Sequence, residues 1–194
     1  MTASIDLTPW NDSIREFSAT KRNLPHLQDP GGYYFTDSNT FDRWELPEFA
    51  RDLVADALRF FDGEKYELLA YVVMPDHFHL ILHPLPKTEN GYYNLREIFH
   101  SIKSFTAKRI LERVEEPPRQ HRSIAKRLKT HIWQDENYDH LIRDERDYWE
   151  KMNYIINNPI EAGLVSDPYD YPWLWWIGMP AKDRGQDGRA TQKL

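Results

Sequence analysis

The 194-residue sequence contains no cysteine. A chain without cysteine has no disulfide bonds, no thiolate nucleophile and no metal site built from thiolates. It also lacks any apolar run approaching the roughly 20 residues of a membrane-spanning helix. Its first residues, from Met1 to Asp6, have neither the basic nor the apolar part of a signal peptide. We therefore expect a soluble, cytoplasmic protein with no membrane partner, long enough for one domain with a substantial core.

Positive charge is scarce, because 25 Lys and Arg residues stand against 31 Asp and Glu residues, for a formal net charge of -6. This balance alone argues weakly against a nucleic-acid-binding protein. The charge is unevenly distributed, since residues 96–129 contain 10 Lys and Arg and 4 Asp and Glu, a net charge of +6. One basic segment in an acidic protein is consistent with a local site for a polyanion, and a solvated helical face is an equally ordinary cause.

Proline and glycine divide the chain into an N-terminal arm over residues 1–24, a single domain over residues 25–178 and a flexible polar tail over residues 179–194. Strands and helices alternate in the domain without a repeat. This order predicts an α+β fold, an antiparallel sheet with packed helices. The expected strands or extended pieces are 33–41, the hairpin 66–83, 131–134 and 138–142. The expected helices run from Pro47 to about residue 61, from Asn94 to about Arg113, and from Asp144 to near Asn158, where Pro159 ends the last one.

Each expected helix has one apolar stripe that predicts its buried face. The first stripe is Phe49, Leu53, Ala57 and Phe60; the second is Leu95, Ile98, Phe99, Ile102 and Phe105; the third is Tyr148, Met152, Ile155 and Ile156.

The hairpin contains the most informative stretch, in which a β-branched strand from Tyr71 is followed by a Pro-Asp turn and a second strand ending at His83. Side chains of a strand alternate between its faces. Alternation places the core residues Phe78, Leu80 and Leu82 on one face, and His77, His79, Ile81 and His83 on the other. Two imidazoles on one face of a rigid strand can bind one divalent metal. From these residues alone, two surface or hydrogen-bonded histidines are the more ordinary interpretation.

Tyr154 lies off the apolar stripe of the third helix and groups with Lys151 and Asn158, three residues before it and four after it. A tyrosine thus projects from the polar side of a packed helix, with an amide one turn further on. A half-exposed tyrosine of this kind is common on helices, so the residue alone indicates no function.

Taken together, these segments resemble a known family. The segment from Met74 to Leu82 (MPDHFHLIL) resembles the His-hydrophobic-His segment of the HUH single-tyrosine transposases. Three further segments resemble the REP-associated tyrosine transposases in particular: Trp133-Gln134, Tyr138–Asp144 and Tyr154–Val165. Arg22–His26 and Tyr171–Trp173 are similar to the flanks of that subfamily. The similarity covers roughly residues 22–175, in the order of the family.

The resemblance implies an RRM-like or ferredoxin-like α+β fold and a metal-dependent DNA strand transfer that acts on palindromic repeat DNA, single-stranded or folded into a hairpin. It implies Tyr154 as the nucleophile that forms a 5′-phosphotyrosine, and His77 and His79 as ligands of Mg²⁺ or Mn²⁺. In related enzymes a polar residue one turn after the tyrosine completes the site, and here Asn158 holds that place. Many relatives outside this subfamily have Gln there. The sequence leaves open whether the protein is a monomer or a homodimer, and whether Tyr154 acts in its own subunit.

Contacts to DNA phosphates are expected where positive charge is dense. Aromatic residues at the C-terminal end, Tyr169, Tyr171, Trp173, Trp175 and Trp176, could stack on unpaired bases, although burial against the sheet is expected for most of them. The residues expected to contact phosphates are Arg96, His100 and Lys103 on one helix face, and Arg119, Arg122, Lys126, Arg127 and Lys129 in the segment that follows.

Two other functions stay open. One is a different enzyme, either a rolling-circle initiator or relaxase-like HUH nuclease or a metal hydrolase that uses the same histidines. The segment from Asn158 to Val165 favours the transposase subfamily over these. The other is a DNA-hairpin-binding protein without turnover, against which the simultaneous presence of His77, His79 and Tyr154 argues.

Overall fold

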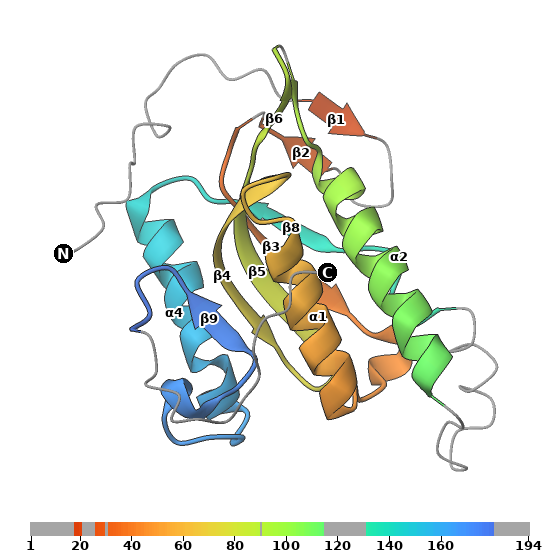
Figure 1. Ribbon diagram of the computed structural model, residues 1–194. Helices are drawn as coiled ribbons and strands as arrows, with labels where there is room; N and C mark the ends of the chain where they lie inside the picture. The colour runs from red at the N-terminus through yellow and green to blue at the C-terminus, as the bar shows by residue number, and fades with distance from the viewer. Residues whose placement is uncertain (1–17, 21–25, 30, 90, 115–130, 181–194) are drawn as a thin grey trace.

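The computed structural model describes residues 18–20, 26–29, 31–89, 91–114 and 131–180. At its centre is an antiparallel five-stranded sheet with the order β8-β3-β5-β4-β9 (Figure 1). Its strands are β3 (Tyr34–Asn39), β4 (Tyr66–Val73), β5 (His77–Pro84), β8 (Tyr138–Leu141) and β9 (Leu174–Trp176). The helices are α1 (Glu48–Phe60), α2 (Leu95–Arg113) and α4 (Glu145–Glu161). Smaller elements are the strand pairs β1 (Ser18–Thr20) with β2 (His26–Gln28) and β6 (Pro86–Thr88) with β7 (Gly91–Tyr92), and the 3-10 helices η2 (Phe41–Arg43) and η4 (Pro168–Asp170).

The chain order β3-α1-β4-β5-α2-β8 is a ferredoxin-like βαββαβ arrangement. Strand β5 lies between β3 and β4, so the two strands joined by α1 are not neighbours in the sheet. Helix α4 and strand β9 are added after this unit, and β9 extends the sheet beside β4. The predicted α+β fold, an antiparallel sheet with packed helices, is therefore confirmed.

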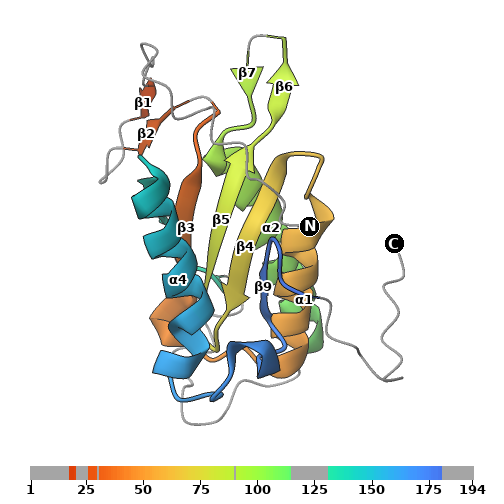
Figure 2. The same ribbon diagram turned by 90° about the vertical axis from the view of Figure 1, so that its left-hand side faces the viewer.

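The helices form a layer on each side of the sheet. Figures 1 and 2 show α1 and α2 together on one side and α4 on the other. Helix α1 contacts α2 and β4, whereas α4 contacts β4, β5 and β9. Both faces of the central strands are consequently covered, and Phe78, Leu80, Ile81 and Leu82 of β5 are all fully buried.

The hairpin formed by β4 and β5 has the predicted turn at Pro75 and Asp76, closed by a hydrogen bond from the Met74 amide to the His77 carbonyl (2.8 Å). The predicted alternation is confirmed by packing: the Phe78 ring stacks on Phe99 of α2 (6.3 Å between centroids), on the side away from α4. The histidines of β5 therefore face α4.

Two predicted stripes are wrong at their ends. On α1 the buried residues are Ala50, Val54, Ala55, Ala57 and Leu58, while Phe60 is 61% exposed. Phe49 and Leu53 are partly buried against the core, and Phe60, at the end of the helix, packs edge-on against Phe61 instead. On α2, Phe105 is 42% exposed, and Thr106 and Ile110 continue the buried face from Ile102 at intervals of four residues. The buried Thr106 hydroxyl has its hydrogen bonds satisfied, because it donates to the Ile102 carbonyl (2.8 Å) and accepts from Trp133 Nε1 (2.9 Å).

Helix α4 does not end near Asn158 as predicted but continues through Pro159 to Glu161. Proline removes one backbone donor from a helix, and here only one further turn follows it. That turn closes with hydrogen bonds from Ala162 to the Asn158 carbonyl (3.0 Å) and from Leu164 to the Pro159 carbonyl (2.9 Å). Gly163 has a φ of 70°, the left-handed geometry that glycine adopts most easily at a helix end.

Residues 131–134 form no strand, but Trp133 makes an isolated bridge to Thr40, and 138–142 contains β8 as predicted. The boundary predicted at residue 24 falls between β1 and β2, which pair with each other. Within the described ranges, no helix combines the length and apolarity needed to cross a bilayer.

Candidate active site

The two histidines lie on the central strand of the sheet, in register with polar residues of β3. His77 is opposite Asn39, and His79 is opposite Asp37. Their ring centroids are 4.7 Å apart, with an angle of 71° between the ring planes. The sheet therefore fixes two imidazoles side by side on its α4 face, as the alternation of the strand predicts.

The histidines differ in their polar contacts. Nδ1 of His77 lies 2.6 Å from Oδ1 of Asp76, so Nδ1 carries the proton and the lone pair is on Nε2. His79 is buried, and neither of its ring nitrogens has a hydrogen-bond partner in the described part of the chain. Its Nδ1 is 3.9 Å from Asp37 Oδ2. Burial, and secondarily the charges of His77 and Arg43, lower the pKa of His79 to about 3, so the imidazole is neutral and its lone pair is free.

These features fit a metal ligand. A buried ring nitrogen without a partner is costly, and a divalent ion accepts the lone pair of a neutral imidazole. No group of three or more His, Cys, Asp or Glu side chains among the described residues is placed to hold a metal ion. A third protein ligand would therefore have to be of another type, such as an amide.

Helix α4 brings Tyr154 to the histidines. Its Tyr148, Met152 and Ile155 side chains are buried, whereas Tyr154 is 43% exposed. The Tyr154 ring packs edge-on against His79 (5.1 Å between centroids) and against Phe35 (5.8 Å). The tyrosine and the histidine pair of one chain thus meet, which is the arrangement needed for Tyr154 to act in its own subunit.

Asn158 lies one helical turn beyond Tyr154 and is buried. It belongs to the same helix as Tyr154. Its role as a third ligand stays a prediction.

Other residues near the site have separate structural explanations. Nζ of Lys151 lies 3.6 Å from Oε1 of Glu150 and 5.8 Å from the centroid of the Phe35 ring, which Tyr154 also contacts. His83 stacks on Tyr33 (4.7 Å between centroids), as a structural residue would. Tyr148 is buried, and burial raises the pKa of its hydroxyl, which leaves it unsuited as a nucleophile.

The residues expected to contact DNA phosphates are only partly described. Arg96 and His100 are exposed on α2, on the side of the sheet away from α4. Lys103 is half-buried, and its Nζ donates to the Gln134 carbonyl (2.8 Å). Burial lowers the pKa of Lys103 to about 8, against the opposing effect of Asp139, Asp135 and Asp37. The others, Arg119, Arg122, Lys126, Arg127 and Lys129, lie outside the described residues.

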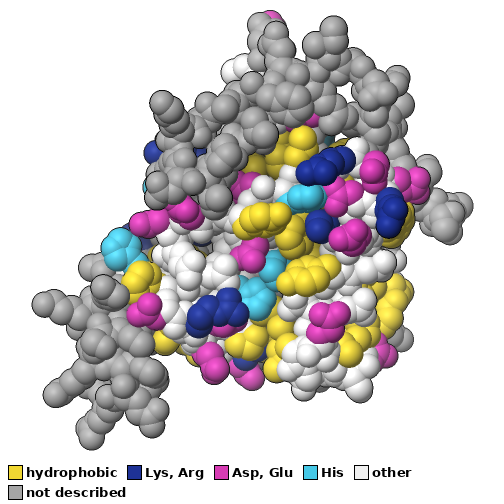
Figure 3. Space-filling model, turned by 180° about the vertical axis from the view of Figure 1, so that it is seen from behind, with side chains coloured by type: hydrophobic (Ala, Val, Ile, Leu, Met, Phe, Trp, Pro, Cys, Tyr) yellow, Lys and Arg dark blue, Asp and Glu magenta, His cyan; other side chains and the backbone are white. Residues whose placement is uncertain are grey.

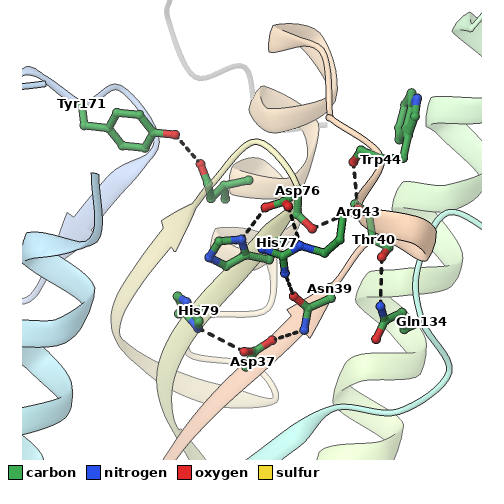
Figure 4. Close-up of polar contacts among 11 residues, drawn as sticks. Asp37, Asn39, Thr40, Arg43, Trp44, Asp76, His77, His79, Gln134 and Tyr171 are labelled. Atoms are coloured by element: carbon green, nitrogen blue, oxygen red, sulfur yellow. Dashed lines mark hydrogen bonds and ion pairs between the residues drawn. The ribbon is translucent and has the colours of Figure 1, made fainter. Parts of the chain in front are cut away.

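Most of the aromatic residues at the C-terminal end are packed, as expected. Tyr171 is buried and its hydroxyl donates to the Val73 carbonyl (2.9 Å; Figure 4). Trp173 is buried and donates to Asp52 (2.9 Å), and Trp175 stacks on Tyr71 (6.3 Å). Trp176 is half-buried, and its ring centroid lies 5.3 Å from that of Tyr169. Tyr169 is 41% exposed, more than the other four aromatic residues.

A polar network around the histidines was missed by sequence reasoning (Figure 4). Arg43 Nε lies 2.6 Å from Asp76 Oδ2, Arg43 Nη1 donates to Asn39 Oδ1, and Asn39 Nδ2 donates to Asp37 Oδ1 (2.7 Å). Figure 3 shows histidine side chains in the middle of this face, bordered by hydrophobic, acidic and basic ones. Asp76 could have been found because it directly precedes His77, but nothing in the sequence connects Arg43 or Asn39 to the hairpin.

Comparisons with known proteins agree with this geometry. A protein of Haemophilus influenzae assigned to the REP-associated tyrosine transposases is 27% identical over 149 residues, which cover 74% of this chain and 78% of that protein. The REP-associated tyrosine transposase of Escherichia coli K12 is 32% identical over 109 residues, which cover 56% of this chain and 53% of that protein. The chain thus matches about half of the length of the second relative.

A solved structure of a REP-associated tyrosine transposase bound to a REP hairpin has the same fold. It superposes with a TM-score of 0.60 and 21% sequence identity, over 79% of this chain and 82% of that chain. The family model for IS200-like transposases matches residues 48–158, more than half of the chain, and this range includes both histidines, Tyr154 and Asn158. The chain therefore belongs to the IS200-like transposase family, and its curated relatives are REP-associated tyrosine transposases.

Proposed function

We propose that this protein is a metal-dependent single-stranded DNA endonuclease and strand transferase, acting on palindromic repeat DNA through a 5′-phosphotyrosine. The observation that supports the proposal best is the contact of an exposed tyrosine with one of two closely spaced imidazoles. The Tyr154 and His79 rings are 5.1 Å apart, and the His79 and His77 rings 4.7 Å apart. A structural tyrosine beside structural histidines would be expected to have its polar atoms satisfied, whereas both nitrogens of His79 are buried without partners among the described residues.

The donor set suits Mg²⁺ or Mn²⁺, with His77 and His79 supplying imidazole nitrogens and Asn158 supplying an amide oxygen. Bound there, the ion would act as a Lewis acid on a phosphate oxygen. The protein contributes orientation: Asp76 fixes the tautomer of His77 through the 2.6 Å contact with its Nδ1. His79 is held by burial in the middle of the sheet.

Tyr154 is the nucleophile in this proposal. Its phenolic oxygen bonds to phosphorus as the bond from phosphorus to the 3′ oxygen breaks; the phenol loses its proton, and the leaving strand gains one as a 3′-OH. The 5′ phosphate remains on the tyrosine. A 3′-OH of another strand can reverse the step, so strand transfer needs no nucleotide cofactor. The exposed ring of Tyr154 leaves room for a DNA backbone to approach.

A folded single strand is the proposed substrate. The chain shares its fold with a REP-associated tyrosine transposase that was solved with a REP hairpin, and its curated relatives have the same family name. We therefore propose hairpins formed by palindromic repeats that flank the gene.

The proposal is tested by incubating the protein with such single-stranded palindromes and Mg²⁺ or Mn²⁺, and by scoring covalent protein–DNA adducts on denaturing gels. Tyr154→Phe should bind the hairpin but form no adduct, because only the attacking oxygen is lost. Tyr138→Phe is the matched control, since Tyr138 is also exposed (56%) and lies on β8 opposite Asp37. An adduct of normal yield in Tyr154→Phe would exclude Tyr154 as the nucleophile. Hairpin binding by the wild type without any adduct would instead indicate a binding protein without turnover.

A further inference from the structure

The turn that follows β3 contains two consecutive residues with left-handed backbone geometry. Asp42 has a φ of 52° and Arg43 a φ of 57°, and no other non-glycine residue in the described ranges has a positive φ. Side chains with a Cβ rarely adopt this geometry, and it persists where surrounding contacts hold it, often at functional sites. This geometry occurs directly after β3, the strand that pairs with the histidine strand β5.

The Arg43 guanidinium is held by two acceptors, one at each of two nitrogens. Nε lies 2.6 Å from Asp76 Oδ2, and Nη1 donates to Asn39 Oδ1. The other Asp76 oxygen, Oδ1, binds Nδ1 of His77 at 2.6 Å. A single carboxylate therefore connects the guanidinium to the imidazole, and Figure 4 shows Arg43 reaching between Asp76 and Asn39 toward His77.

The third nitrogen of the guanidinium, Nη2, is left for a ligand. Nη2 of Arg43 has no partner among the described residues, and the side chain is 57% exposed. A planar guanidinium carries five N–H donors in a fixed fork that matches the oxygens of a phosphate. Here part of the fork is used to fix its orientation, and the remainder points to solvent.

The charges around the histidines show why a cation is needed. Asp37 and Asp76 lie next to the imidazoles, and two carboxylates would repel a DNA phosphate. The Arg43 charge opposes them, because its Nε lies 2.6 Å from Asp76 Oδ2.

We propose that Arg43 is a catalytic residue that binds a non-bridging oxygen of the scissile phosphodiester beside His77 and His79. This inference rests on the proposed function and adds to it the residue that recognises the phosphate. Negative charge grows on the non-bridging oxygens as Tyr154 attacks, and a cation held in advance at that position stabilises it. Asp76 and Asn39 hold the guanidinium in place, so no reorganisation is needed when DNA arrives.

The test removes either the negative charge of the scissile phosphodiester or the positive charge of Arg43. In a Tyr154→Phe background, hairpin DNA with a neutral methylphosphonate at the scissile position is compared with the natural phosphodiester. With Arg43 present, the neutral linkage should weaken binding about 10-fold or more, as expected for a charged hydrogen bond. With Arg43→Gly, the same linkage should cost clearly less, because one partner of that phosphate, the guanidinium, is already absent and only the proposed metal ion remains. Glycine is chosen because it adopts the left-handed geometry of position 43 without strain, so the turn is retained.

Arg59→Ala is the matched control. Arg59 is a partly exposed arginine of α1 with a carboxylate partner, Asp56, at 3.4 Å, on the side of the sheet away from α4. This variant should keep the full methylphosphonate penalty, which shows that the effect is specific to position 43.

A bracing role and a phosphate-binding role give different results. If Arg43 acted only by holding Asp76 and through it His77, Arg43→Gly would weaken Mn²⁺ binding and leave the methylphosphonate penalty unchanged, and the inference would be overturned. The inference would also be overturned if Arg43→Gly removed the methylphosphonate penalty at a neighbouring phosphate and not at the scissile one. Failure of the wild type to bind or cleave any hairpin would count against the proposed function rather than against Arg43 alone.

Discussion

At the scale of single residues, two histidines separated by one position have different surroundings. His77 is partly exposed and held by Asp76, whereas His79 is buried between Phe35 and Tyr154, whose rings both pack against it. Strand alternation predicts that both imidazoles share a face. It does not predict the burial of His79, because Phe35 and Tyr154 come from parts of the chain far away in sequence. The proposed role of the pair depends on this burial, which keeps His79 neutral and leaves its nitrogens without hydrogen-bond partners in the described part of the chain.

We predict that His77→Ala and His79→Ala each abolish cleavage and Mn²⁺ binding, and that EDTA abolishes cleavage by the wild type. Asn158→Ala should have a milder effect, because a neutral amide oxygen is a weaker ligand than imidazole for such ions. Single-turnover cleavage and calorimetric Mn²⁺ titration measure the two effects. His83→Ala is the control, since His83 is on the same face of β5 but stacks on Tyr33. Full cleavage in EDTA would remove the metal from the mechanism.

At the scale of elements, α4 determines where Tyr154, the proposed nucleophile, lies. Asp144 caps its first turn by accepting a hydrogen bond from the Asp147 amide (2.8 Å). Asp147 in turn binds His140 of β8 at 2.8 Å, which ties the start of the helix to the edge of the sheet. The cap and the buried face of α4 could be predicted because both depend on local spacing. The continuation through Pro159 could not, because it depends on the hydrogen bonds of the turn that follows.

Loss of the cap should therefore destabilise the protein. We predict that Asp144→Ala lowers the free energy of unfolding by about 0.5–2 kcal/mol, the usual effect of removing an N-cap acceptor. Urea unfolding of the two proteins would measure this change in the free energy of unfolding. Asp56→Ala is the matched control, because Asp56 is an exposed residue inside α1 with no capping role. An equal loss in both variants, or none in Asp144→Ala, would show that the cap is unimportant for α4.

At the scale of the whole molecule, the site depends on a sheet order that the sequence does not reveal. Strand β3 pairs with β5 rather than with β4, and this pairing places Asp37 and Asn39 opposite the histidines. Periodicity predicts the elements and their buried faces but not which strands become neighbours, since that is decided by long-range packing. The placement of the candidate ligands and of the proposed nucleophile on one face of the sheet was therefore predictable from local patterns and family resemblance. The network of Asp37, Asn39, Arg43 and Asp76 was not.

The overall charge bears on how the molecule binds DNA. The chain has a formal net charge of -6, and carboxylates flank the histidines, so attraction of the DNA backbone must come from local basic groups. Phosphate contacts dominate affinity and make it dependent on salt, with a slope of roughly 0.7 per contact for single strands. The densest positive charge lies at residues 119–129, which contain five Lys and Arg residues and no acid.

We predict that replacing Lys126, Arg127 and Lys129 together with alanine lowers affinity for all single strands and flattens the plot of log K against log salt concentration by up to ~2 units. The reason is that binding with fewer phosphate contacts releases fewer counterions, whatever the base sequence. Fluorescence anisotropy with a hairpin and an unstructured strand, over a range of salt concentrations, measures both quantities. The control replaces Lys108, Arg109 and Arg113 of α2, which removes the same charge from a described helix. Equal losses in the two variants would mean that only net charge matters, and unchanged affinity and slope in the first would place the DNA path elsewhere on the protein.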